Sequence, residues 1–563
     1  MNFDQIINKE IAEKKSIVLI DGYIGVDWTN IIDPIKEKDN INILSMDDCY
    51  KAPSDIKELI APFLTDDPFF GKVYEGAIED FLNTKKVKEL TAVLEKRGGV
   101  VVLYGPGAVN QYTKNLADII IYVDIAPEEL IQRTRRGEVE PFAHDAKRSK
   151  VKLDKNAPGY LSTKRFHYVD FPLLNNHRKN VLKSTDYYID ANEAENPKIV
   201  SKDVYNKAIS EIVKGPFRPV PHYDPAPWGG QWLKKVRNLK NDWPNVGWSY
   251  DLIAPDMAVR IPAKDSYIEV PFISIVNQEA EALMGPYVTE KFNNHWPIRV
   301  NYDDTLGNKK KEHGMGIHVH PPTKYVRDNF KEKWGQQESY YMLAVGEGAT
   351  VYLGLKEDAD LEEFSKAAKK AEDGVPFDYE KYLNAFPAKE GDLFLIPTGT
   401  VHSGKNVVVL EISATTVRYT LRIYDYLRPD LSGNMRHIAT HHAFKVIDPK
   451  KRTKWIKNNL IQKPRRIRGG ENWTEYTIGK QEDIFFEISR IEFKDYYPDE
   501  TGDRFHLLTL AKGEVAEIIP DKNPQKAFKI KLSETVIVPA TTGPYKVRVQ
   551  GDVEAHIVKS MVK

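Results

Sequence analysis

The chain contains very little cysteine: a single residue, Cys49, among 563. One cysteine cannot form an intramolecular disulfide, and it excludes a zinc site built from several thiolates. A chain so poor in cysteine is typical of a reducing compartment. We therefore expect a cytoplasmic protein in which any zinc site uses other ligands.

Net charge and long apolar runs are also lacking. Lys and Arg together number 81, as do Asp and Glu, so the formal net charge is zero. This balance argues against a general polyanion binder, and we expect no nucleic acid among the partners. No stretch approaches the roughly 20 apolar residues that span a bilayer, so no membrane partner is expected either. The opening MNFDQIINKEIAEKK lacks the apolar centre of a signal peptide.

The length exceeds what one hydrophobic core supports and predicts about three or four domains. The first part of the chain alternates apolar, β-rich runs (15–25 and 99–108) with a helical pattern (80–98). A third strand and a helix follow at 116–139. Such alternation predicts a parallel sheet with crossover helices.

The order of these segments resembles P-loop kinases of the nucleoside and nucleoside-monophosphate type, in which YVDIAPEELIQRTRRGE (122–138) looks like a late strand and a lid helix. The phosphate-binding loop G-x-x-x-x-G-K-[ST] is missing, because the first strand runs into DGYIGVDWTN (21–30). That stretch has no lysine, and Asp27 adds negative charge. The resemblance implies a kinase-like α/β domain over 1–214 without kinase activity. Arg133 and its neighbours either bind an anion or belong to a solvated lid helix.

The composition and the apolar pattern of the sequence change near residue 214. The proline-rich stretch 213–233 is typical of a linker. Beyond it, short β-branched and aromatic runs separated by turns predict antiparallel double-sheet barrels. A helical insertion is expected at about 358–385. The predicted domains are therefore 215–465, which holds the insertion, and 466–563, a smaller barrel.

Four side chains in the second part have the spacing of a metal site. His318 and His320 are two residues apart, so a strand would point both imidazoles to one side. Glu338 begins the next strand-like run, and His402 follows the turn IPTGT. Three imidazoles and a carboxylate suit zinc or another first-row divalent ion. The alternative is two surface histidines and an unrelated third among the 14 in the chain.

Residues from about 220 to 563 resemble the class I mannose-6-phosphate isomerases, which are zinc-dependent cupins with a jelly-roll fold. Several motifs of that family occur in its order: PAPWGGQWL (225–233), HVHPPTKY (318–325), QQESYYML (336–343), GDLFLIPTGTVHSGKNVVVLEIS (391–413) and YTLRIYDYLR (419–428). The end of the chain, ETVIVPATTGPYKVRVQGDVEAHIV, is similar to the final β-domain of the family. The resemblance implies one Zn²⁺ per chain, or another divalent metal. The ligands would be His318, His320, Glu338 and His402.

The resemblance also implies aldose–ketose isomerisation through a cis-enediol, with Arg422 as the catalytic arginine. A metal would polarise or orient the substrate oxygens, and a fixed guanidinium would stabilise the charge of the enediolate. Proton transfer needs a base, for which Asp425 and a metal-bound hydroxide are the candidates. Alternatively, Asp425 and Tyr424 only buttress Arg422.

Three positions depart from the family pattern. His318 stands where the family commonly has glutamine, Gln336 where it has lysine, and Gly316 where serine is common. The last two changes weaken the assignment of a phosphorylated substrate. Lys324 or Lys405 are possible substitutes, or both are plain surface lysines. The expected substrate contacts are Trp228, Lys324, Gln336, Lys405 and Tyr424.

We therefore expect a metal-dependent isomerase that interconverts mannose 6-phosphate and fructose 6-phosphate, with a sugar or sugar phosphate as its small-molecule partner. The alternatives are the same chemistry on another, unphosphorylated sugar and a non-catalytic sugar-binding regulatory protein. A kinase–isomerase with two activities would need ATP binding by residues 1–214. A regulatory or docking role is our expectation for that part, and the oligomeric state is left open.

Overall fold

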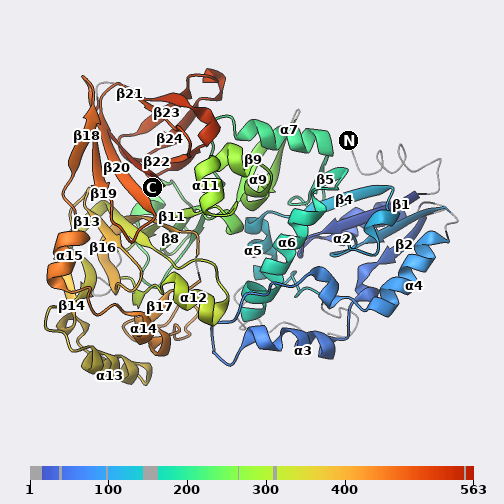
Figure 1. The fold of residues 1–563 in the computed structure, drawn as a ribbon, viewed down its shortest axis with the longest axis horizontal. Coiled ribbons are helices and arrows are strands. Elements are labelled where there is room, and N and C mark those ends of the chain that lie inside the picture. Colours follow the sequence, from blue (N-terminus) through green and yellow to red (C-terminus); the bar gives the residue numbers. More distant parts are fainter. Residues whose placement is uncertain are drawn as a thin grey trace. The chain divides into compact units, whose positions relative to one another are not determined.

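The computed structural model describes residues 16–36, 38, 41–96, 99–143, 163–263, 266–307, 314–416, 418–550 and 553–563. The chain divides into two compact units (Figure 1). Unit 1 comprises Met1–Ser210 and Asp256–Asn277, and unit 2 comprises Glu211–Pro255 and Gln278–Lys563. A multidomain chain with an α/β part and a β-rich part is thereby confirmed.

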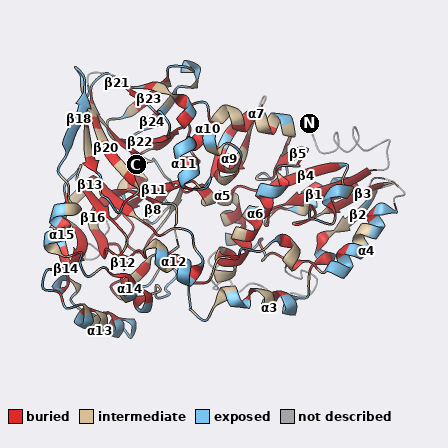
Figure 2. Cartoon of the chain, in the orientation of Figure 1, coloured by how far each residue is buried: buried red, intermediate tan, exposed pale blue. Residues whose placement is uncertain are grey.

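Unit 1 is built on a six-stranded sheet in the order β2-β3-β1-β4-β5-β6. Its strands are β1 (Ser16–Gly22), β2 (Ile41–Ser45), β3 (Val100–Tyr104), β4 (Ile119–Asp124), β5 (Tyr187–Asp190) and β6 (Lys198–Ser201). Neighbours from β2 to β5 run parallel, and only β6 is antiparallel to its neighbour. All seven residues of β1 are buried (Figure 2), as expected for a parallel strand covered on both faces.

Helices connect these strands, and those at Thr84–Glu95 and Pro127–Arg135 lie within the segments 80–98 and 116–139 for which a helix is predicted. They are α2 (Trp28–Lys36), α3 (Pro53–Leu64), α4 (Thr84–Glu95), α5 (Pro127–Arg135), α6 (Phe171–Val181) and α7 (Lys202–Ile212). Helix α4 begins where the side chain of Asn83 accepts hydrogen bonds from the backbone N–H groups of Lys85 and Lys86. Helix α5 begins with Pro127, which needs no N–H partner at that position. Gly98, one of the glycines expected to end α4, lies outside the described residues.

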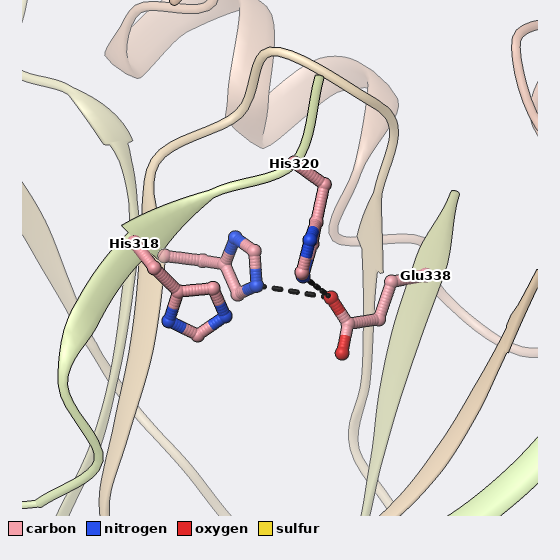
Figure 3. Close-up of side chains that lie close together, drawn as sticks. His318, His320 and Glu338 are labelled. Atoms are coloured by element: carbon pink, nitrogen blue, oxygen red, sulfur yellow. Dashed lines mark ion pairs between the residues drawn. The ribbon is translucent and has the colours of Figure 1, made fainter. Parts of the chain in front are cut away.

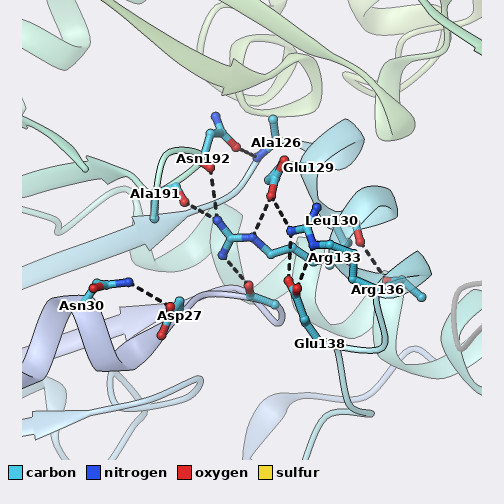
Figure 4. Close-up of polar contacts among 12 residues, drawn as sticks. Asp27, Asn30, Ala126, Glu129, Leu130, Arg133, Arg136, Glu138, Ala191 and Asn192 are labelled. Carbon is cyan, nitrogen blue, oxygen red and sulfur yellow. Dashed lines mark hydrogen bonds and ion pairs between the residues drawn. The ribbon is translucent and has the colours of Figure 1, made fainter. Parts of the chain in front are cut away.

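Asp21, near the end of β1, is a fully buried carboxylate. Asp21 accepts hydrogen bonds from the N–H groups of Gly107 (3.1 Å) and Val109 (2.8 Å), and His177 Nε2 lies 2.8 Å from it. Arg133 is also engaged, because its guanidinium donates to the carbonyl groups of Gly25, Ala191 and Asn192 (Figure 4). These contacts favour a structural role for Arg133 over anion binding. The kinase-like resemblance stays a prediction.

One segment that we assigned to the barrels belongs to unit 1. Residues 257–276 form the antiparallel pair β9 (Ala258–Ala263) and β10 (Ser266–Pro271), followed by α9 (Phe272–Gln278). Asp190, at the end of β5, accepts a hydrogen bond from Glu269 N (2.8 Å), and Tyr188 donates to Glu269 O (3.3 Å). These bonds, from side chains of β5 to the backbone of Glu269, tie β10 to β5. The chain therefore returns to unit 1 after the predicted boundary at 214, and that boundary is corrected accordingly.

Unit 2 begins with a nine-stranded antiparallel sheet in the order β14-β13-β16-β11-β8-β7, to which β12, β15 and β17 add short pairings. Its strands are β7 (His222–Asp224), β8 (Trp248–Leu252), β11 (Ile298–Asp304), β12 (Ile317–Val319), β13 (Glu338–Leu355), β14 (Leu383–Pro387), β15 (Leu393–Ile396), β16 (His402–Ala414) and β17 (Leu421–Tyr424). Strand β13 pairs with both β15 and β16 at its first residues, so Glu338 lies in the interior of the sheet.

The last hundred residues form two further antiparallel sheets, β18-β19-β20-β27-β22-β25 and β21-β26-β23-β24. Their bounds are β18 (Arg465–Gly469), β19 (Trp473–Gly479), β20 (Phe486–Phe493), β21 (Tyr496–Glu500), β22 (His506–Lys512), β23 (Val515–Pro520), β24 (Phe528–Lys531), β25 (Thr535–Val538), β26 (Pro544–Val549) and β27 (Ala555–Val562). An apolar core between the sheets includes Leu508, Ile518, Val547 and Ile557. We call this part the C-terminal barrel.

Unit 2 also contains short helices between its strands. They are α8 (Trp232–Val236), α10 (Ala280–Met284), α11 (Pro286–Lys291), α12 (Thr323–Phe330), α13 (Leu361–Glu372), α14 (Thr440–Val446) and α15 (Thr453–Asn459). Helix α13 and the 3-10 turn Tyr379–Lys381 lie between β13 and β14, where the helical insertion is expected. Among the described residues, no helix combines the length and apolar character needed to cross a bilayer.

The cap of α4 offers a test of the fold of unit 1. Replacing Asn83 by Ala removes an acceptor for two N–H groups and should destabilise the helix by about 1 kcal/mol. Hydrogen exchange of the α4 amides should accelerate by about fivefold. Asn83→Asp keeps an acceptor and should restore slow exchange. Equal exchange in Asn83→Ala and the parent protein would contradict the capping assignment.

Candidate metal centre

Three strand termini of unit 2 bring four buried side chains together. His318 lies in the middle of β12 and His320 directly after it, so both point to one side. Glu338 is the first residue of β13, and His402 is the first of β16. The pairing of β12 with β16 sets His318 directly opposite His402. The expected ligand residues are thus neighbours because of strand register.

The potential ligand atoms of these four residues all lie within 4.8 Å of one another. His320 Nε2 is 2.9 Å from Glu338 Oε2, and His402 Nε2 is 3.0 Å from the same oxygen (Figure 3). The rings of His318 and His402 have centroids 4.1 Å apart. Even the most exposed of the four, His318, has only 8% of its surface accessible. The cluster is therefore compact and shielded from solvent.

Each imidazole is oriented by a backbone carbonyl on its other nitrogen. Nδ1 of His318 lies 2.7 Å from Gly316 O, that of His402 lies 2.9 Å from Thr400 O, and that of His320 lies 3.2 Å from the Tyr419 carbonyl. A carbonyl can only accept, so Nδ1 must carry the proton in each ring. This leaves Nε2 as the nitrogen of each ring that is not bound to a carbonyl and can serve as a ligand atom. This is the arrangement in which histidine binds metals.

Two atoms in the cluster have no ordinary partner. Glu338 Oε2 and His402 Nε2 are buried and make no hydrogen bond within the described part of the chain, although they are 3.0 Å apart. Two lone pairs that face each other repel unless a cation lies between them. Burial, followed by the neighbouring imidazoles, lowers the pKa of His318 well below its usual value. Three imidazoles and a carboxylate fit a divalent metal, and this N₃O set suits zinc or another first-row ion.

Gln336 contacts this cluster from one side. With its amide oriented so that Nε2 donates to Thr416 O (2.7 Å), Oε1 accepts from Arg299 Nη2 at 2.8 Å and lies 3.2 Å from His320 Nε2. Arg299 is itself buried and paired with Glu411. The position where the family has lysine therefore holds a neutral amide beside a buried guanidinium.

Arg422 lies on β17 directly opposite His318 of β12, on the same face. Its Nη1 donates to His437 O at 2.6 Å. Burial, followed by the charge of Arg436, lowers the pKa of Arg422 to about 10, so that it stays protonated at neutral pH. Asp425 lies 3.9 Å from Arg422 Nε.

Asp425 is surrounded by guanidinium groups. One of its oxygens accepts from Arg428 (2.6 Å) and the other from Arg436 (2.7 Å). Arg428 Nε is buried without a hydrogen-bond partner among the described residues. A cavity of about 200 Å³ lies beside this group and is lined by Tyr424, Asp425, Arg428 and Arg436. Three arginines around one carboxylate leave local positive charge.

The other expected substrate contacts lie elsewhere. Trp228 is buried edge-on against Trp248, with ring centroids 4.8 Å apart, as a packing residue would be. Tyr424 belongs to an aromatic cluster that includes Phe377, at 4.6 Å. Its hydroxyl-bearing ring still borders the cavity beside Asp425.

The two lysines do not join the cluster. Lys324 on α12 has 86% of its side chain exposed and pairs with Asp328 at 2.6 Å. Lys405 is partly exposed on β16, opposite Thr350 of β13. Neither makes a hydrogen bond or an ion pair with the four ligand residues in the described part of the chain. We therefore no longer place Lys324 in the site, because its position is that of a surface lysine.

Sequence reasoning missed Arg299 and Arg436. A signal for Arg299 exists, because β11 alternates polar and apolar residues as Arg299, Asn301 and Asp303, all buried. Polar residues on the inner face of a strand indicate a polar interior. Arg436 has no comparable signal, since it lies in an irregular segment after β17.

Comparison with known proteins gives different results for the two parts of the chain. Residues 3–214 match a family described as a domain of unknown function (DUF8485). The mannose-6-phosphate isomerase of Streptococcus mutans serotype c is 25% identical over 223 residues, which are 39% of this chain and 64% of that protein. ManA, a mannose-6-phosphate isomerase of Bacillus subtilis, is 27% identical over 135 residues, or 24% of this chain and 40% of that protein. The chain thus spans less than two thirds of these relatives.

Two solved structures are similar to this one. The mannose 6-phosphate isomerase of Bacillus subtilis has a TM-score of 0.48 and 17% identity, over 62% of this chain and 99% of that chain. A putative mannosephosphate isomerase of Archaeoglobus fulgidus has a TM-score of 0.48 and 20% identity, over 62% of this chain and 98% of that chain.

Metal content tests the cluster directly. His320→Ala removes one of three nitrogen ligands and should reduce bound zinc from about one per chain towards zero. His402→Ala should do the same. The measurement is elemental analysis after dialysis of zinc-loaded protein. His556→Ala, which changes a histidine of the C-terminal barrel, is the matched control and should keep the metal. Full zinc content in His320→Ala would rule out this site.

Proposed function

We propose that the chain is a metal-dependent aldose–ketose isomerase that interconverts mannose 6-phosphate and fructose 6-phosphate. The observation that carries the proposal is the convergence of His318, His320, Glu338 and His402 beside Arg422. The curated relatives are mannose-6-phosphate isomerases, which supports a sugar isomerase. The proposal extends to a cytoplasmic location, in keeping with the buried, free Cys49.

The reaction moves a proton between C1 and C2 of the sugar through a cis-enediol. A divalent metal held by the three histidines and Glu338 would supply Lewis acidity towards the substrate oxygens. The Nδ1–carbonyl hydrogen bonds of the histidines keep the ligand geometry rigid before substrate arrives. The burial of the cluster excludes water, which strengthens every charge interaction within it.

Arg422 stabilises the negative charge that develops on the enediolate. Its guanidinium stays protonated at neutral pH, although burial lowers its pKa to about 10. Its hydrogen bond to His437 O and its register opposite His318 fix its direction before the reaction begins. A preorganised charge of this kind stabilises a transition state without reorganisation.

Asp425 positions Arg422 in this scheme and does not act as the base. Both of its oxygens accept charge-assisted hydrogen bonds from Arg428 and Arg436, which orient the carboxylate towards the arginines, as suits a positioning role. The buttressing role that we weighed for Asp425 is therefore the one we propose.

The arginine cluster supports a phosphorylated substrate. Arg422, Arg428 and Arg436 surround one carboxylate and border the 200 Å³ cavity or lie next to it. Guanidinium groups are well suited to phosphate because their donors match its oxygens in pairs. A side chain at Gly316 would pack tightly against the arginine cluster. A Cβ there would lie 3.1 Å from Asp425 Oδ1 and 3.2 Å from Arg422 Cδ.

A second candidate is the same chemistry on an unphosphorylated sugar. Gln336 favours it, because an amide replaces the positive lysine of the family beside the metal ligands. Substrate competition separates the two. We expect zinc-dependent formation of fructose 6-phosphate from mannose 6-phosphate, inhibited by chelator, and no turnover of free mannose. Turnover of mannose alone would select the second candidate, and turnover of neither would leave a sugar-binding protein.

Replacement of Arg422 tests the mechanism. Arg422→Ala should retain zinc and lower kcat for mannose 6-phosphate by roughly two to three orders of magnitude, because one preorganised charge is lost. Arg327→Ala, on the surface helix α12, is the control and should leave kcat unchanged. Steady-state kinetics with metal analysis provides both readouts. Near-normal kcat in Arg422→Ala would contradict the assigned role.

A further inference from the structure

The inner face of the C-terminal barrel changes character along its strands. On β20, Ile491 and Phe493 lie in the apolar core, whereas Ser489 and Glu487 continue the same face. On β27, Ile557 belongs to the core and Lys559 continues that face. The barrel is therefore apolar at one end and polar at the other.

The polar end encloses a cavity of about 420 Å³. Its lining comes from both sheets, with Thr477 on β19, Ser489 on β20 and His506 at the start of β22 facing Asp499 of β21. Barrel mouths are common ligand sites, and this volume falls within the usual range of small-molecule pockets. The four predicted metal ligands belong to other strands, so the cavity is separate from the proposed active site.

Buried charges form the floor of the cavity. Lys559 Nζ lies 2.8 Å from Glu475 and 2.8 Å from Asp499. Arg468 also pairs with both carboxylates. Glu475 is 2% exposed and Lys559 is 4% exposed. Burying such groups is costly even when they are paired, and apolar residues of the same size would often be at least as stable. The network therefore points to a role other than stability.

Charges of the two signs nearly balance around the cavity. Five Lys or Arg and four Asp or Glu side chains line it. His506 adds no charge, because burial, followed by the nearby Lys559, lowers its pKa to about 3. Its Nδ1 lies 2.8 Å from the hydroxyl of Tyr545, which holds the ring in place. The lining thus offers many hydrogen-bond donors and acceptors but has little net charge.

The near balance of positive and negative side chains around the cavity favours one class of ligand over another. An anion such as phosphate would face four carboxylates, and three of the five lining cations are already paired with carboxylates of the lining: Arg468, Lys480 and Lys559. A hydroxyl group both donates and accepts, so it can bond to a carboxylate and a guanidinium at once. Thr477 and Ser489 are paired across β19 and β20, and their hydroxyls add further groups that both donate and accept hydrogen bonds.

We propose that the polar mouth of the C-terminal barrel is a second small-molecule site, which binds an uncharged polyhydroxylated ligand of monosaccharide size. The site does not depend on the metal cluster or on isomerase activity.

The test uses the full-length His320→Ala protein, so that the proposed active site does not contribute. D-mannose, D-fructose, D-glucose and myo-inositol are titrated separately, with inorganic phosphate as the anionic probe, by calorimetry and saturation-transfer NMR. We expect at least one uncharged probe to bind with a stoichiometry of one per chain. Ser489→Met, added to this background, should fill the cavity and weaken binding by about tenfold or more.

Two further variants keep the test decisive. Thr477→Val removes a wall hydroxyl with little change in volume and should also weaken binding, which covers the case in which Ser489→Met does not fold. Thr474→Val changes the opposite face of β19 and should leave binding intact. The inference is overturned if no uncharged probe binds at millimolar concentration, if phosphate binds in their place, or if Ser489→Met and Thr477→Val bind as well as the control.

Discussion

The hydrogen bond from each imidazole Nδ1 to a backbone carbonyl is the constraint on which the site depends. Gly316 O, Thr400 O and Tyr419 O each accept from one histidine, and Nε2 of His320 and of His402 lies within 3.0 Å of Glu338 Oε2. The pairings of β12 with β16 and with β17 place His318 opposite both His402 and Arg422.

The two β-rich parts of unit 2 differ in how their buried polar groups are satisfied. In the first, polar side chains meet at the strand termini and leave Glu338 Oε2 and His402 Nε2 without partners, which a cation would satisfy. In the C-terminal barrel, Lys559 and Arg468 already neutralise the buried carboxylates. Because the charges at the polar mouth of the barrel neutralise one another, this mouth suits an uncharged ligand that forms hydrogen bonds. In unit 1, the buried Asp21 is satisfied by the backbone N–H groups of Gly107 and Val109.

Much of the site could be predicted because its spacing reflects strand geometry. Two histidines at i and i+2 must share a face of a strand, and a carboxylate at the start of the next strand can reach them. The α/β alternation of unit 1 could also be predicted, because the buried strands β1 and β4 appear in the sequence as continuous apolar runs. Long-range features could not be read this way. β10 contacts β5 through a hydrogen bond from Glu269 N to the side chain of Asp190, 79 residues away, and Arg436 reaches Asp425 from an irregular segment.

X-ray absorption at the zinc edge tests the central claim most directly, because it reads the ligand set of the bound ion. The account predicts a four-coordinate shell of nitrogen and oxygen at about 2.0 Å, with the multiple-scattering pattern of three imidazoles and no sulfur. Loss of one imidazole in His402→Ala should reduce that pattern. A shell containing sulfur, a six-oxygen shell, or a spectrum unchanged in His402→Ala would contradict the account, since the metal would then lie elsewhere in the chain.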